Sequence, residues 1–364
     1  MRVLQVIDSL RIGGAEVLVR DLAPRLLQRG IKCDVLVLSR SHSFLEISLQ
    51  DAGVKLIDTG VLDVYSPRQI LVLAERISGY RLVHVHLFPA QLWAVLAVGL
   101  QSGCTLVTTE HGTPNRRRWW FRPVDAWMYS RYARIACVSD DTAEGLARWC
   151  PNVKDKLQVI PNGISLERFT NAHPAALLGV GDGKMKAVFV GRFEPPKDHA
   201  TLLRALALAP RIHLFLLGDG PLRKQLEQLA RDLGVWDRAT FAGFRNDVPE
   251  FLNACDIYVH STMAEGFGIA ACEAMAAGLP VVASDVPGLA EVVQGAGVVV
   301  PVGNHERLAR ELNALADSTE KRTRMSEASR RRAQDFSIEK TVDRYIQMYE
   351  SVLQSAATQR KVMA

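Results

Sequence analysis

Short runs rich in Val, Leu and Ile alternate along this chain with longer stretches of amphipathic helical periodicity, and this alternation restricts the fold more than any other feature. Such runs, bounded by turn residues and separated by helices, are typical of a parallel sheet that is covered on both faces. In the first half the expected strands are 3–7, 32–38, 82–86, 105–109 and 134–138, with a helix at 15–28 and a further strand around 158, before Pro161-Asn162-Gly163. The sequence therefore predicts an α/β fold.

A second series of strand-like runs follows a polar, glycine-rich segment at 171–184. Its expected strands are 186–190, 212–217, 238–241, 257–260, 281–283 and 297–300. With 364 residues, 48% of them hydrophobic, the chain is long enough for two cores. We therefore expect domains at 1–165 and 185–336, a linker at 166–184, and a last helix at 338–353 with a tail within 337–364. Two such halves leave a cleft at the carboxyl ends of their strands, where ligands of open α/β sheets bind.

Composition limits the location and the partners of the protein. The first apolar run is interrupted at Asp8, which does not fit a signal or transit peptide. The longest nearly uninterrupted apolar stretch, 92–100, is shorter than the ~20 residues of a membrane-spanning helix. Six cysteines without a C-x-x-C pair indicate reduced thiols in a cytoplasmic protein. A net charge of +5 is small for this length and gives no argument for nucleic-acid binding.

A glutamate motif in the second half points to a ligand with a diphosphate. Glu265 is followed by Gly266-Phe267-Gly268 and, eight residues after it, by Glu273. If the run from Gly268 is helical, its amino end favours an anion. The offset between the glutamates is at most ~12 Å in a helix, comparable with the reach of a sugar, diphosphate and nucleoside. The spacing alone fits equally an ordinary solvated helix with two surface glutamates.

Two cations follow the first expected strand of the second half. Gly191 and Arg192 come directly after that strand, and Lys197 lies five residues beyond Arg192. Arg offers a fork of donors and Lys a compact charge, and both suit a leaving diphosphate whose negative charge grows in the transition state. Cations after strands are more often solvated loop residues, so this pair is informative only beside the glutamate motif.

The first half has two candidate ligand contacts. Gly13 and Gly14 lie between the first expected strand and helix, where glycine lets the backbone approach a ligand. A dinucleotide-binding turn needs G-x-G-x-x-G and an acidic residue after the second strand, and this chain has neither, which disfavours a dehydrogenase. His111 follows a strand, at the expected edge of the cleft, where it could hydrogen-bond a sugar. His84 and His86 alternate on a strand and are more consistent with a structural role.

The order and spacing of these motifs resemble those of the retaining nucleotide-sugar glycosyltransferases of family 4, which have the GT-B fold of two Rossmann-like domains facing a central cleft. The resemblance covers nearly the whole chain. It rests on Gly13-Gly14-Ala15-Glu16, Glu110-His111-Gly112, Pro161-Asn162-Gly163-Ile164, Val190-Gly191-Arg192 with Lys197, and Glu265-Gly266-Phe267-Gly268 with Glu273.

The resemblance implies a hexosyltransferase that uses a UDP- or GDP-sugar donor and a sugar or lipid-linked acceptor in the biosynthesis of a cell-surface polysaccharide or glycolipid. Arg192 and Lys197 would then hold the donor diphosphate, Glu273 the ribose, Glu265 the donor sugar and His111 the reacting face. The implied donor-binding set is completed by Gly13, Gly14, Gly191, Gly266, Phe267 and Gly268. The last helix is implied to cross back onto the first domain.

We expect activity without a metal or other cofactor, because the sequence contains no D-x-D triplet to hold a metal on the diphosphate. Two other functions stay open. A nucleotide-sugar 2-epimerase would bind the same donor and need no acceptor. A non-catalytic nucleotide-sugar-binding protein would be expected to lack one or more of the five charged or imidazole side chains named above, and all five are present.

A basic and aromatic segment suggests a membrane contact. Arg116, Arg117 and Arg118 precede Trp119 and Trp120, followed by further aromatic residues. Basic residues beside aromatic ones suit anionic membrane surfaces. The segment is consistent with peripheral binding at the inner face of the membrane, and equally with a loop and helix whose aromatic side chains pack against the domain.

Overall fold

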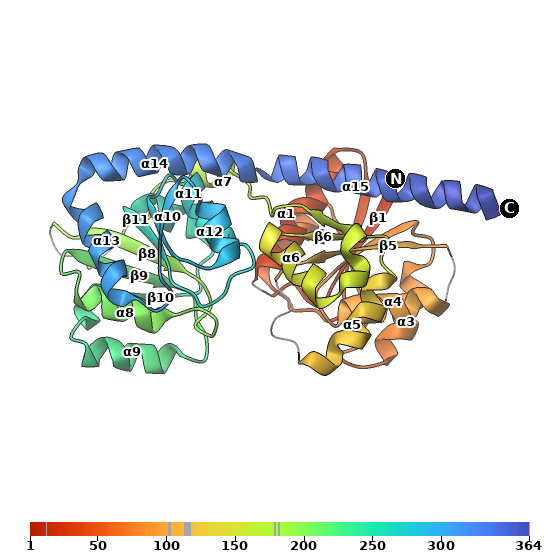
Figure 1. Ribbon diagram of the computed structural model, residues 1–364, viewed down its shortest axis with the longest axis horizontal. Coiled ribbons are helices and arrows are strands. Elements are labelled where there is room, and N and C mark those ends of the chain that lie inside the picture. Colours follow the sequence, from red (N-terminus) through yellow and green to blue (C-terminus); the bar gives the residue numbers. More distant parts are fainter. Residues whose placement is uncertain (12, 101–102, 113–117, 178–179, 181–182, 364) are drawn as a thin grey trace. The chain divides into compact units, whose positions relative to one another are not determined.

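The computed structural model describes residues 1–11, 13–100, 103–112, 118–177, 180 and 183–363, with side chains to residue 358. The chain forms two compact units (Figure 1). The first unit contains Met1–Gly163 and Ile338–Ala364, and the second contains Ile164–Ser337.

The first unit is built on a seven-stranded sheet in the order β3-β2-β1-β4-β5-β6-β7, and its paired strands are parallel. The strands are β1 (Arg2–Ile7), β2 (Lys32–Val37), β3 (Lys55–Asp58), β4 (Leu82–His86), β5 (Thr105–Glu110), β6 (Arg134–Cys137) and β7 (Leu157–Val159). Strand β3 is not among the expected strands, because it lies at an edge of the sheet and is only partly buried, which leaves a weak hydrophobic pattern.

Helices cover both faces of this sheet. They are α1 (Gly14–Gln28), α2 (Phe44–Asp51), α3 (Arg68–Ile77), α4 (Ala90–Leu100), α5 (Arg122–Ser130), α6 (Asp140–Trp149) and α15 (Ile338–Met363), with short 3₁₀ turns η2 (Trp119–Phe121) and η3 (Pro151–Lys156). One core joins the sheet to α1, α2 and α15, and the other joins it to α3, α4, α5 and α6. Helix α15 extends ten residues beyond the expected end at 353.

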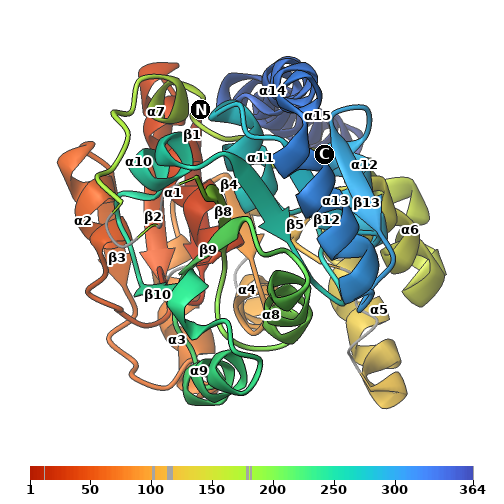
Figure 2. The ribbon, with the colours of Figure 1, turned by 90° about the vertical axis from the view of Figure 1, so that its left-hand side faces the viewer.

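The second unit has a six-stranded sheet in the order β10-β9-β8-β11-β12-β13, which can be followed in Figure 2. Its strands are β8 (Met185–Val190), β9 (Ile212–Leu217), β10 (Ala239–Gly243), β11 (Ile257–His260), β12 (Val281–Ser284) and β13 (Gly297–Val300). Its helices are α7 (Glu167–Thr170), α8 (His199–Ala207), α9 (Arg223–Asp232), α10 (Val248–Ala254), α11 (Ile269–Ala276), α12 (Pro287–Val293), α13 (His305–Asp317) and α14 (Thr319–Ala333), with η4 (Trp236–Arg238) and η5 (Gln334–Phe336). Two parallel sheets covered by helices confirm the predicted α/β fold.

The segment expected to be a linker, 166–184, lies in the second unit and partly packs on α10. The Asn253 side-chain amide donates to the Phe169 carbonyl oxygen over 2.8 Å, and the Ala175 N–H donates to the Glu250 carbonyl oxygen over 3.0 Å. These bonds belong to a folded segment, which the glycine-rich composition of 171–184 did not suggest. Within the described part of the chain, none of the helices combines the length and the apolar character that crossing a bilayer requires.

A carboxyl group, Asp8, follows the central strand β1. The Ala90 N–H, at the start of α4, donates to its Oδ1 over 2.9 Å. Burial, with a smaller contribution from the Glu16 charge, outweighs the bond from Ala90 and raises the pKa of Asp8 to about 7. Asp8 therefore carries a proton in the folded protein at pH values where an ordinary aspartate is ionised.

This raised pKa predicts a pH-dependent gain in stability for Asp8→Asn. Between about pH 4 and pH 7 the folded protein keeps a proton that the unfolded chain releases, so the free energy of unfolding falls as the pH rises. Since each pKa unit corresponds to about 1.4 kcal/mol, the loss approaches about 4 kcal/mol above pH 7. Asn keeps an acceptor for Ala90 but cannot ionise. Thermal unfolding should show equal melting temperatures near pH 4 and an increasingly higher one for Asp8→Asn towards pH 8.

The matched control is Asp51→Asn, which changes an exposed carboxyl group at the end of α2. Its difference from the wild type should not grow over the same pH range. Parallel curves for Asp8→Asn and the wild type would contradict a protonated Asp8.

Candidate functional site

The centre of the candidate site is an ion pair between Lys197 and Glu265 in the second unit. Lys197 lies in the segment after β8, and Glu265 in the segment after the neighbouring strand β11. Backbone bonds join the two segments: the Asp198 N–H donates to the Ser261 carbonyl oxygen over 3.1 Å, and the Met263 N–H to that of Pro196 over 2.9 Å. The carboxyl edge of the sheet therefore holds two of the predicted residues together.

Two residues that the sequence analysis did not single out, His260 and Tyr258, complete this cluster. His260 Nε2 lies 2.9 Å from Lys197 Nζ and 3.2 Å from Glu265 Oε2, and its Nδ1 lies 3.0 Å from the Tyr258 hydroxyl. Both side chains are almost fully buried. A signal was present, since residues 258 and 260 alternate on a strand that ends just before Glu265 and so share one face of the sheet.

The cluster carries one positive and one negative charge. Burial lowers the pKa of His260 to about 4, as does the Lys197 charge, so the imidazole is neutral at physiological pH. Burial by itself would raise the pKa of Glu265, but the Lys197 charge and the contact with His260 outweigh it and hold that pKa below its ordinary value. Glu265 is therefore ionised while the histidine beside it adds no charge.

The amino end of α11 lies directly after this cluster. Gly266 and Phe267 lead to Gly268, which precedes the helix with a φ of 95° and provides no side-chain cap. Phe267 is buried and makes an edge contact with Phe336, with ring centroids 5.4 Å apart. Glu273 lies in the second turn and is partly buried. Unsatisfied amides at a helix amino end favour an anion, and this helix begins four residues after Glu265, the partner of Lys197.

Gly288 fixes the path of the chain around Glu265. A Cβ atom at this position would lie 2.5 Å from the carbonyl oxygens of Glu265 and Gly266. Only glycine therefore allows α12 to approach this turn so closely.

The structure separates the two predicted cations. Arg192 follows Gly191 at the carboxyl end of β8, and 63% of its side chain is exposed. It pairs with Glu194, with 2.9 Å between Nη1 and Oε1, whereas Lys197 belongs to the buried cluster. Since exposed ion pairs contribute little free energy, Arg192 can leave Glu194 at low cost.

In the first unit, Gly13 precedes α1 and Gly14 is its first residue. The Glu16 carboxylate folds back over this turn, since a Cβ atom at Gly13 would lie 2.4 Å from Glu16 Oε2. A negative side chain at a helix amino end is favourable, but in this position it also opposes a phosphate. The structure therefore gives the glycine pair less anion-binding character than the amino end of α11.

His111 follows β5 and is linked to His86. His111 Nε2 lies 3.1 Å from His86 Nδ1. Burial lowers the pKa of His111 to about 3, so that its imidazole is neutral. Its Nδ1 is shielded from solvent and has no hydrogen-bond partner among the described residues. His84 and His86 are fully buried.

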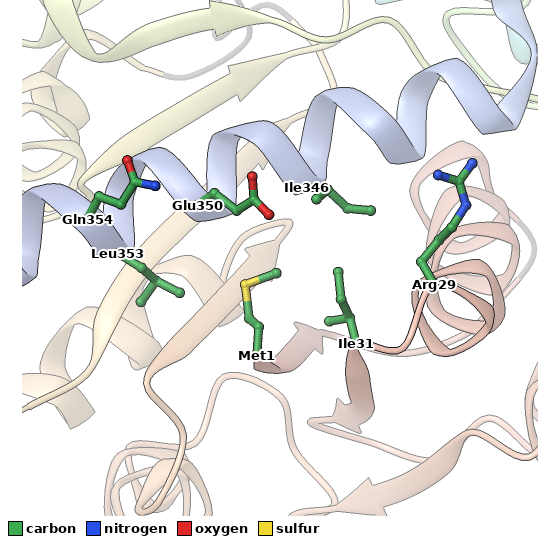
Figure 3. A pocket seen from close by; sticks show the side chains of 7 residues that line it. All are labelled: Met1, Arg29, Ile31, Ile346, Glu350, Leu353 and Gln354. Atoms are coloured by element: carbon green, nitrogen blue, oxygen red, sulfur yellow. The ribbon is translucent and has the colours of Figure 1, made fainter.

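A cavity of about 540 Å³ lies at the amino-terminal ends of the strands of the first sheet (Figure 3). Met1 and Ile31, which line it, directly precede β1 and β2, and α15 forms another wall with Ile346 and Leu353. Ligands of parallel α/β sheets bind at the carboxyl ends of the strands. This cavity lies at the amino ends and is not part of the candidate site.

Two further observations concern metal ions and the basic aromatic segment. Across the described ranges, no group of three or more His, Cys, Asp or Glu side chains is placed to hold a metal ion. Arg116 and Arg117 lie outside the described residues. Trp119 and Trp120 are 78% and 48% exposed, and the Arg118 guanidinium lies 4.8 Å from the Trp120 ring centroid.

Comparisons with known proteins match both halves of the chain to glycosyltransferases. The model of Glycosyltransferase Family 4 matches residues 12–168, and that of Glycosyl transferases group 1 matches residues 177–332. The lipopolysaccharide core biosynthesis glycosyltransferases LpsE and LpsD of Rhizobium meliloti are 34% and 31% identical over 54% and 63% of this chain. These matches span 59% and 66% of the two relatives.

The crystal structure of Anabaena Alr3699/HepE in complex with UDP and glucose has the same fold. It superposes with a TM-score of 0.85 over 96% of this chain and 100% of that chain, at 21% sequence identity. The two family models together account for most of both units, and the structural match confirms the predicted GT-B fold. The chain belongs to the glycosyltransferases of family 4.

Proposed function

We propose that this protein is a retaining glycosyltransferase that moves a hexose from a UDP- or GDP-sugar to a sugar or lipid-linked acceptor, in the biosynthesis of a cell-surface polysaccharide or glycolipid. The observation that carries the proposal is the Lys197–Glu265 ion pair beside the amino end of α11. LpsE and LpsD are lipopolysaccharide core biosynthesis glycosyltransferases, and the HepE crystal structure contains UDP and glucose. Both observations support the same class of donor and product.

In this proposal Lys197, Arg192 and the amino end of α11 neutralise the donor diphosphate. An ammonium group has three N–H bonds. Glu265 and His260 account for two of them in Lys197, so a third can meet a phosphate oxygen. The neutral His260 orients the ammonium group without competing for the anion. Cations and helix amides stabilise the charge that grows on the leaving group, and no metal is required for this step.

The two glutamates have different roles in the proposal. Glu265, beside Lys197, faces the donor sugar and stabilises the positive charge that develops at its anomeric carbon. Glu273 accepts hydrogen bonds from the ribose hydroxyls, and Gly191, Gly266, Phe267 and Gly268 let the backbone approach the donor. In the first unit, His111 hydrogen-bonds a sugar hydroxyl, and Gly13 and Gly14 complete the donor contacts.

A panel of nucleotide sugars tests this function. A true donor at about 100 times its Kd should add about 2.7 kcal/mol to the free energy of unfolding, which thermal unfolding detects. Transfer should require an acceptor and should continue in excess chelator. Conversion of the donor to an epimer without acceptor would indicate a 2-epimerase, and protection without turnover would indicate a binding protein. Loss of transfer in chelator that Mn²⁺ restores would refute the metal-independent mechanism.

Substitution of the two glutamates should separate their roles. Glu273→Gln removes a contact that is similar in the ground and transition states, so mainly the donor KM should rise. Glu265→Gln removes a charge that matters most in the transition state, and kcat should fall by roughly 10²- to 10³-fold. Both changes keep the size of the side chain. A change in KM alone for Glu265→Gln would reduce that residue to a binding role.

The anomeric configuration of the product, determined by NMR, belongs to the same experiment. We expect retention, with the acceptor attacking from the side that the diphosphate leaves. An inverted product would exclude the retaining mechanism.

We further propose that the acceptor is reached at an anionic membrane surface, on which the segment around Trp119 and Trp120 binds. The alternative, in which these side chains pack against the domain, is disfavoured by their exposed fractions of 78% and 48%. Exposed indole rings with a neighbouring guanidinium group suit the headgroup region of a bilayer.

Co-sedimentation with vesicles tests the membrane contact. The wild type should bind vesicles that contain anionic lipid, and Trp119→Ser with Trp120→Ser should remove most of this binding. Trp236→Ser in the second unit is the matched control, since Trp236 is also exposed and lies 3.9 Å from the Arg231 guanidinium group. Equal binding by both variants, or no binding by the wild type, would contradict a membrane contact through this segment.

A further inference from the structure

A strip of polar side chains crosses the face of the first sheet that α15 covers. Gln5, His84 and Thr109 come from three adjacent strands, β1, β4 and β5, and face Tyr345 and Tyr349 of the helix. All five side chains are fully buried. Buried polar groups are costly unless their hydrogen bonds are satisfied, so the arrangement of protons in this strip is restricted.

One branch of the strip runs from α15 to His111. The Gln5 Nε2 group donates to the Tyr349 hydroxyl over 3.2 Å, and Gln5 Oε1 lies 2.9 Å from His86 Nε2. His86 Nδ1 then lies 3.1 Å from His111 Nε2. A continuous chain of hydrogen bonds therefore connects Tyr349 to His111.

A second branch restricts the proton of Tyr349. Its hydroxyl oxygen lies 2.7 Å from His84 Nδ1, and His84 Nε2 lies 2.8 Å from Thr109 Oγ1. A separation of 2.7 Å suits an O–H donor, whereas 3.2 Å is long for O–H···O and ordinary for N–H···O. Tyr349 therefore donates to His84 and accepts from Gln5, which orients the Gln5 amide with its oxygen towards His86.

The three histidines of this hydrogen-bond network, His84, His86 and His111, are neutral, and each has one N–H. Burial lowers the pKa of His84 and that of His111 to about 3, and burial with the two neighbouring imidazoles lowers the pKa of His86 as well. A neutral imidazole donates from one nitrogen and accepts at the other. His86 must donate from Nε2 to Gln5 Oε1, so its Nδ1 accepts, and His111 must donate from Nε2.

We propose that Gln5 and His86 are positioning residues that hold His111 in its Nε2–H tautomer, so that His111 Nδ1 faces the substrate as a hydrogen-bond acceptor. The described residues provide no partner for this nitrogen, and it is shielded from solvent. A hydroxyl group of a sugar is a donor of the required kind. This last step rests on the proposed function, whereas the assignment of the tautomer does not.

The opposite orientation of the Gln5 amide would lead to the other tautomer of His111. If the Gln5 amide were reversed, its nitrogen would donate to His86 Nε2, and His86 Nδ1–H would donate to His111 Nε2. His111 Nδ1 would then carry the proton and would require an acceptor. The orientation of the buried Gln5 amide therefore decides whether His111 Nδ1, the last atom of this chain of hydrogen bonds, accepts or donates.

Two-bond ¹H–¹⁵N correlation spectra of protein labelled with ¹⁵N-histidine distinguish these states without donor or acceptor. The signals of His111 are assigned by their loss in His111→Asn. The wild type should show an unprotonated Nδ1 and a protonated Nε2 at His111. A protonated Nδ1 would overturn the proposal.

Two substitutions of Gln5 provide a sharper comparison. Gln5→Leu removes the acceptor of His86, so His86 should move its proton to Nδ1, and His111 should shift towards the Nδ1–H tautomer. Gln5→Glu retains acceptor oxygens while its carboxyl group is ionised, so the wild-type tautomer should persist at a pH above the pKa that burial gives this carboxyl group. Tyr345→Phe is the matched control, because Tyr345 contacts Thr109 but not Gln5 and lies one turn from Tyr349 on α15. An unchanged His111 in Gln5→Leu, or a changed one in Gln5→Glu or Tyr345→Phe, would refute the role of Gln5.

Transfer assays add the functional consequence. Gln5→Leu should lower kcat/KM about tenfold, which corresponds to the loss of one hydrogen bond to the substrate, and Gln5→Glu should restore it. If the spectra agree and no variant, the wild type included, transfers sugar, the proposed function fails while the tautomer assignment stands. If the wild type transfers sugar but has a protonated His111 Nδ1, the assignment fails and the proposed function stands.

Discussion

Both sheets of this protein are parallel and covered by helices on both faces, and the placement of its polar groups depends on this constraint. A side chain in the middle of such a strand has no access to water, so a polar one must find partners within the core. Charged groups are favourable only where strands end and loops begin. Lys197 and Glu265 follow this rule in the second unit. In the first unit the ionisable groups Asp8 and His111 also lie just beyond strand ends, where burial favours their neutral forms.

The partly buried ion pair of the second unit shows how the constraint shapes the candidate site. Taking a carboxylate and an ammonium group out of water costs free energy, which their attraction offsets only in a good geometry with additional hydrogen bonds. His260 supplies such a bond by accepting from Lys197 through Nε2, and its Nδ1 contacts the Tyr258 hydroxyl. The pair is therefore ordered before any donor arrives, and little rearrangement of these side chains is needed when it binds. Preorganised charges of this kind contribute most when the charge of the substrate changes during reaction.

Local sequence patterns predicted most of the strands and the class of fold, because hydrophobic periodicity is a property of neighbouring residues. The strands of the second sheet lie within a residue or two of their expected positions. The patterns failed at β3, which is short and half-buried. In the glycine-rich segment 171–184 the Ala175 N–H donates to the Glu250 carbonyl oxygen on α10, a contact that no local pattern indicates.

The hydrogen-bond and ion-pair partners of the polar side chains could not be predicted in the same way. Lys197 meets Glu265 because β8 and β11 are neighbours in the sheet although β9 and β10 separate them in the sequence. Strand order depends on the whole fold, and no window of adjacent residues contains it. His260 and Tyr258 could have been proposed from their alternation before Glu265, whereas the bond between Gln5 and Tyr349 joins residues that are 344 positions apart.

That long separation affects the order in which the protein can fold during synthesis. Strand β1 leaves the ribosome before the other helices and strands described here, and α15, which covers it, leaves after them. Until then the core of the first unit lacks Val342, Tyr345, Met348, Tyr349 and Val352, and the amide of Gln5 and the ring of His84 face water. The second unit does not include α15 and can therefore form its core earlier. The unit that is translated first is thus the one completed last, and the nascent first half must be protected from aggregation while the second is made.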